Sequence, residues 1–168
     1  MISDVVPWKR ALRGDRRTLA RWIQLYWQEH DQAYFVIERR VFLSAFAIRR
    51  ILETRQLYPS NIKYTLEVLT FQRNQMNTWH PSSMSTNVSM VLENYYIDRP
   101  QKESISLRTI SNTIIHSFLF FPAEWANIGI SGFMVCSDHT KDDRLVAVSW
   151  NEYFKMLDAI SADDAGEP

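Results

Sequence analysis

The feature that most restricts the fold of this chain is the segment from Gln32 to Leu57, which is apolar on nearly every side when it is read as a helix. The proline at position 59 disfavours helical backbone just before it, so the predicted helix ends there. The apolar residues are Phe35, Val36, Ile37, Val41, Phe42, Leu43, Phe46, Ile48, Ile51 and Leu52. Such a helix must be covered by other elements, and we predict that it lies centrally.

Shorter patterns predict the elements around this helix. An apolar face predicts an earlier helix that runs from about Asp15, its N-cap, to His30. The alternation of apolar and polar residues over Ile62–Phe71 predicts a strand, and a helix is the alternative there. Further predictions are strands within 89–97, 118–122, 128–137 and 144–150, a helix from Ser104 or Ser106 to about Ser117, and a last helix over Asn151–Ile160. The fold class is therefore α+β, with two N-terminal helices and the helix near residue 110 packed on a mostly antiparallel sheet. A mainly helical bundle with a small β appendage is the alternative.

The charge of the chain is zero overall but unevenly spread. Residues 1–56 contain 11 Lys and Arg against 6 Asp and Glu, and residues 57–168 contain 8 against 13. The 168 residues suit a single domain, with a basic helical half (about 1–57), an acidic mixed half (about 58–160) and a flexible tail (161–168). The basic half is expected to face the chain's own acidic part, a partner or phosphate.

Several classes of function lack their sequence signature. The single Cys136 excludes an internal disulfide and a cysteine-based zinc site, and there is no phosphate-binding glycine loop, G-x-S-x-G or HExxH motif. The run "SDHTKDD" at 137–143 suits a hairpin loop better than a metal site. No signal peptide or membrane span is visible. We therefore expect a cytoplasmic protein without a cofactor, a metal or a membrane partner.

Three polar residues follow one line along the helix predicted near residue 110. Arg108, Asn112 and His116 recur every four residues, about a quarter turn from the apolar stripe of Leu107, Ile110, Ile114 and Phe118. A histidine beside the core face is partly desolvated, and a neutral imidazole there exchanges protons near neutral pH. The three residues are thus candidate catalytic groups. Alternatively, Asn112 and His116 bind backbone groups at the helix end.

Two arginines of the long apolar helix are candidate substrate-binding residues. Arg39 and Arg50 are eleven residues apart and project in nearly the same direction, with Leu43 and Phe46 between them. They could bind phosphate or the polar line. The alternative is pairing with carboxylates of the fold, such as Glu53 with Arg50.

The stretch "SNTIIHSF" (111–118) resembles the signature of the HEPN family, the higher eukaryote and prokaryote nucleotide-binding domains. In that family an arginine and a polar residue such as Asn precede a histidine on a helix, often with an aromatic residue two positions later. Asn112, His116 and Phe118 match this pattern, whereas Ser111 stands at the arginine's position. Arg108, one turn earlier, is the local substitute.

The resemblance implies an all-helical bundle and, for many members, a metal-independent ribonuclease that acts as a dimer. On this basis we predict an RNA-related defence or toxin-type protein whose degenerate site retains or has lost nuclease activity, with RNA and a second copy as partners. The alternative is a non-enzymatic protein-interaction module of a bacterial or phage system, in which the basic half and exposed aromatic residues bind a protein partner.

Overall fold

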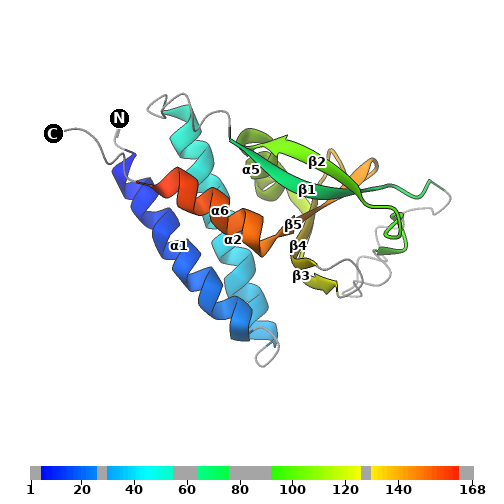
Figure 1. Ribbon diagram of the computed structural model, residues 1–168, viewed down its shortest axis with the longest axis horizontal. Coiled ribbons are helices and arrows are strands. Elements are labelled where there is room, and N and C mark those ends of the chain that lie inside the picture. Colours follow the sequence, from blue (N-terminus) through cyan, green and yellow to red (C-terminus); the bar gives the residue numbers. More distant parts are fainter. Residues whose placement is uncertain (1–4, 26–29, 55–63, 76–91, 126–129, 163–168) are drawn as a thin grey trace.

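The computed structural model describes residues 5–25, 30–54, 64–75, 92–125 and 130–162. These residues form four helices and five strands and confirm the predicted α+β class (Figure 1). The helices are α1 (Val6–Leu25), α2 (His30–Glu53), α5 (Leu107–Ile115) and α6 (Trp150–Ser161), and the strands are β1 (Thr65–Gln72), β2 (Gln101–Ser106), β3 (Ser117–Trp125), β4 (Ile130–Ser137) and β5 (Arg144–Ser149). The polar, Ser-rich sequence at 75–87 predicts a loop, and its residues from 76 onward lie outside the described residues, as does the tail beyond Ala162.

The five strands form one sheet in the order β2-β1-β5-β4-β3, and every neighbouring pair is antiparallel. Successive side chains of a strand point to opposite faces, so each inner strand contributes to two cores. In β4, Phe133 and Val135 belong to the core under the helices, whereas Met134 and Cys136 belong to the core on the other face. The apolar runs that predicted β3, β4 and β5 reflect this burial on both faces.

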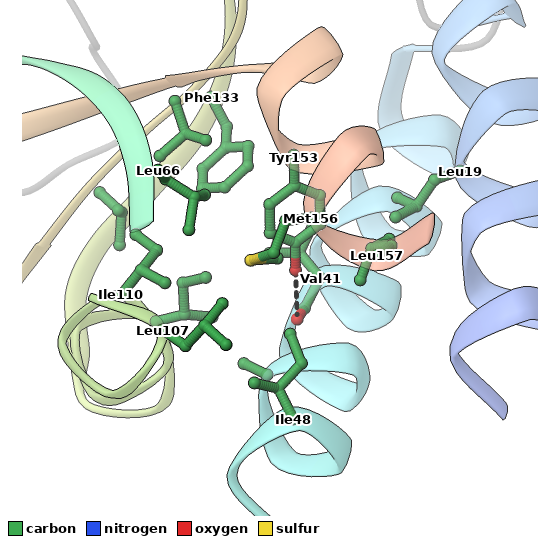
Figure 2. Close-up of a cluster of buried hydrophobic side chains, with 14 of the residues drawn as sticks. Leu19, Val41, Ile48, Leu66, Leu107, Ile110, Phe133, Tyr153, Met156 and Leu157 are labelled. Atoms are coloured by element: carbon green, nitrogen blue, oxygen red, sulfur yellow. Dashed lines mark hydrogen bonds between the residues drawn. The ribbon is translucent and has the colours of Figure 1, made fainter. Parts of the chain in front are cut away.

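Helices α1, α2 and α6 lie together on one face of the sheet (Figure 1). Side chains from α2, α5, α6 and β1 meet in the main core, where Tyr153 of α6 is fully buried (Figure 2). The hydroxyl of Tyr153 lies 2.6 Å from the Ser44 hydroxyl and 3.3 Å from the Val41 carbonyl oxygen of α2. These bonds satisfy the polar groups that burial removes from water, and they fix α6 on α2.

The first helix begins nine residues earlier than predicted. It starts at Val6 with Pro7 in its first turn, where a missing backbone N–H is harmless. Asp15 is therefore not an N-cap: it lies inside α1, buried, and accepts a hydrogen bond from Arg40 of α2 at 2.8 Å. The part of α1 before Asp15 is rich in basic residues, so its sequence shows no clear apolar pattern with the period of a helix.

The strand predicted within 89–97 is wrong for the described residues 92–97, which form turns. Tyr95 of this segment makes a single bridge to Arg73 and packs on the outer face of the sheet. On one side β1 pairs with β5, and on the other side it pairs with β2, which the polar sequence "QKESIS" did not reveal. Only Ile105 of this edge strand is buried, so the sequence of β2 has no alternating apolar pattern.

Candidate functional site

Helix α5 carries the predicted polar line and is fixed at both ends. The Ser106 hydroxyl caps its N-terminus by accepting a hydrogen bond from the Thr109 backbone at 3.1 Å, and His116 is the C-cap residue. Leu107, Ile110 and Ile114 are buried, as the predicted stripe requires. The fourth stripe residue, Phe118, lies in β3 and packs on the core of the opposite face.

A polar cluster joins the middle of α5 to the end of α2. The guanidinium of Arg49 donates to the Asn112 side-chain oxygen at 3.0 Å and to the Glu53 carboxylate at 3.0 Å. With Arg108 and Ser111 these residues line a hollow that is too narrow to admit a water molecule. We call Arg49, Glu53, Arg108, Ser111 and Asn112 the α2–α5 cluster.

His116 lies apart from this cluster. Its side chain is exposed, which makes the expectation of a partly desolvated imidazole wrong, and it does not line the hollow. Arg108 and His116 are eight residues apart on the same helix, a separation of about 12 Å along its axis. A general acid and an electrophilic partner that act on one phosphate must both contact it, so within one chain these two side chains would have to extend toward each other across this distance.

The predicted arginines of α2 lie on a solvent-exposed face. Phe35, Arg39, Leu43, Phe46 and Arg50 fall within an arc of about 80° around α2, and we call them the α2 outer face. Phe35 is 60% exposed, Phe46 51% and Leu43 42%. Helix α2 is therefore not covered on every side, which corrects the prediction made from its composition.

The alternative reading of Arg50 is confirmed, because its guanidinium lies 3.7 Å from the Glu53 carboxylate. Arg39 is exposed and forms no ion pair with any described residue.

A groove runs between α1 and α2 beside the α2 outer face. Its volume is about 310 Å³, and its lining includes Trp8, Ala11 and Gly14 of α1 with Leu43 and Ala47 of α2. The Asp15–Arg40 ion pair also borders it. Burial raises the pKa of Asp15, and the hydrogen bond and charge of Arg40 offset only part of this shift.

The basic residues of α1 divide into two sets. Arg16 pairs with Asp158 at 3.1 Å, while Lys9 and Arg13 donate to the carbonyl oxygens of Ala162 and Ser161 at the end of α6. Cations at a helix C-terminus are favourable, so Lys9 and Arg13 stabilise the end of α6, while Arg16 pairs with an acidic residue of the same helix. Three others, Arg10, Arg17 and Arg21, are exposed, lie within an arc of about 40°, and form no ion pair with any described residue.

Other reactive groups are accounted for by the fold. Cys136 is buried, and desolvation raises the pKa of its thiol to about 11, so it is a poor nucleophile. In the described part of the chain no three His, Cys, Asp or Glu side chains gather as a metal site would require. None of the described helices is both long and apolar enough to cross a bilayer.

Comparisons with family models, with curated proteins and with solved structures found no match for this chain. The site must therefore be interpreted from its own geometry. Sequence reasoning missed Arg49, although its four-residue spacing from Glu53 was a visible signal for an ion pair. It also assigned Phe35, Leu43 and Phe46 to the core. Arg39 and Arg50 lie on the same side of α2, and their charge indicates that this side faces solvent.

Proposed function

We propose that this chain is a non-enzymatic protein-interaction module that binds its partner through the α2 outer face. The observation that carries the proposal is the exposure of Phe35, Leu43 and Phe46 along one side of a single helix. Among the large apolar side chains of the described residues, only Val6 is exposed to a similar extent. A cluster of exposed apolar residues between arginines is typical of an interface.

The free energy gained by covering the exposed apolar side chains of the α2 outer face favours binding of a partner. Covering a large apolar side chain fully contributes roughly 1.5–3 kcal/mol, so three such residues leave a considerable driving force unused in the isolated chain. Aromatic residues and arginine are also the residue types that dominate binding hot spots. Arg39 and Arg50 would orient the partner without adding to the stability of the fold, because both are exposed.

The test is cross-linking in a lysate of the source cells, followed by quantification of the stoichiometric adduct. Phe46→Glu places a charge in the middle of the α2 outer face and should abolish that adduct. Asn151→Glu is the matched control, because Asn151 is exposed on α6 and away from this face. An adduct that both variants retain equally would contradict the proposed function.

A second candidate is the RNA-related, HEPN-like function, because Arg49, Arg108 and Asn112 bring two cations and an amide together beside α5. The all-helical bundle that the resemblance implies does not account for the five-stranded sheet. The test is incubation of RNA with the chain and a chelator. A ribonuclease should cleave, His116→Ala should stop the cleavage, and Ser111→Arg should increase it. Absence of cleavage in all three proteins would remove the ribonuclease form of this candidate.

A further inference from the structure

We infer that the partner presents an acidic amphipathic helix, which lies along the groove between α1 and α2 with its apolar side facing Trp8, Leu43 and Phe46. This inference rests on the proposed function and specifies the chemistry of the partner. Three observations carry it: the shape of the groove, the arginines on its two sides and the length of the exposed stripe.

The shape of the groove suits a helix. Ala11, Gly14 and Ala47 contribute little or no side chain, so another backbone can approach α1 and α2 closely along this line. Trp8 and Leu43 also line the groove and offer apolar surface to an inserted side chain. An apolar ridge of a third helix packing into a groove between two others is an ordinary form of helix recognition.

The charge around the groove selects an acidic partner. Arg10, Arg17 and Arg21 lie on the outer side of α1, and Arg39 lies on α2. None of the four forms an ion pair with any described residue. A helix with Glu or Asp on both edges of its apolar stripe would meet a cation on either side, which directs binding and fixes its register.

The length of the stripe sets the length of the ligand. Phe35 and Arg50 are separated by fifteen residues of α2, or about 22 Å, which a partner helix of roughly 16 residues would cover. A second copy of this chain is disfavoured, because it would place the same unpaired arginines opposite one another. Single-stranded RNA is disfavoured as well, because Phe35 and Phe46 are about 16 Å apart along α2 and provide no continuous stacking platform.

The experiment is selection of binders from a display library of random 16-residue peptides, with the whole chain as bait. We expect the selected peptides to be net acidic, with apolar residues at helical spacing. For a synthetic peptide made from the most frequent sequence, Leu43→Glu and Arg39→Glu should each weaken binding about tenfold or more, whereas Asn151→Glu should not. Binding should also weaken as salt increases.

The other outcomes separate the two proposals. Neutral or basic peptides that still require Phe46 would overturn the acidic helix and leave the proposed function standing. Peptides whose binding is unchanged in Phe46→Glu and Leu43→Glu would overturn both. A dimer in analytical ultracentrifugation that Phe46→Glu dissociates would make a second copy the occupant and overturn the acidic partner. Tight binding of a uridine-rich RNA that depends on Phe46 would overturn it too.

Discussion

At the scale of single residues, the α2–α5 cluster contains one group that the fold leaves unsatisfied. Ser111 is 1% exposed, and its hydroxyl oxygen has no hydrogen-bond partner among the described residues. A buried polar atom without a partner loses its bonds to water and gains none in return. The position that the HEPN resemblance gives to an arginine is therefore occupied by a residue that lowers the stability of α5.

Ser111→Ala should raise the free energy of unfolding by about 1 kcal/mol, because it removes the unsatisfied hydroxyl and places the best helix former in α5. Urea denaturation of the purified chain measures this. The matched control is Thr113→Val in the same helix, which removes a hydroxyl that donates to the Thr109 carbonyl at 3.0 Å and should be destabilising. A loss of stability in Ser111→Ala would show that its hydroxyl is bonded after all.

Asn112 and His116, two residues of the polar line, should respond differently to truncation. Asn112→Ala removes the acceptor of the Arg49 hydrogen bond and should cost about 1 kcal/mol. His116→Ala should change stability by no more than about 0.5 kcal/mol, because the imidazole is exposed. Equal and large losses in both variants would mean that His116 makes contacts that its exposure does not suggest. Thermal and urea unfolding of the two variants decide between these results.

At the scale of elements, the contact between α1 and α2 contains a carboxylate, Asp15, whose charged form is disfavoured by burial. Asp15 is buried between these helices, and its pKa lies above the ordinary 3.8 because desolvation outweighs the bond from Arg40. The folded chain therefore binds a proton at Asp15 more tightly than the unfolded chain does. It follows that this carboxyl contributes to stability at low pH, and that the contribution is lost as the pH rises from 3.8 through the folded pKa.

Asp15→Asn isolates this titration, because the amide oxygen can still accept from Arg40 but has no proton to lose. Relative to Asp15→Asn, the wild-type chain should lose stability as the pH rises above 3.8, and the difference should become constant at higher pH. Urea denaturation of both proteins across this range measures it. A wild-type chain that gained stability relative to the variant over the same range would show that Arg40 dominates.

Elements that are buried on a regular period could be predicted from the sequence, and the polar edge strand β2 could not. Strands β4 and β5 could be recognised as apolar runs because both of their faces are buried. In β2 every residue except Ile105 and Glu103 is exposed, so its sequence shows no apolar alternation. On α5 the line of Arg108 and Asn112 was visible from spacing alone. Its contact with Arg49 was not, because that contact depends on how α2 and α5 pack, which no local pattern records.

At the scale of the whole molecule, the excess of basic residues in the N-terminal half divides into two sets with different roles. One set of α1 cations holds the acidic α6 against the N-terminal half, through Arg16 and Asp158 among others. The other set faces solvent beside the groove and the α2 outer face. The excess of apolar residues in α2 has the same double role: Ile37 and Val41 build the core, while Phe35 and Phe46 face outwards. The exposed residues of α2 thus form the face of the helical layer that we propose for binding.

Hydrogen–deuterium exchange of the full chain, with and without a saturating acidic helical peptide selected as above, tests this central claim most directly. The account predicts slower exchange in α1 and in the part of α2 from Phe35 to Arg50, with β2 and β3 unchanged. The same peptide with lysine in place of its acidic residues should give no protection. Protection confined to the sheet edges, or to α5 around His116, would contradict the account.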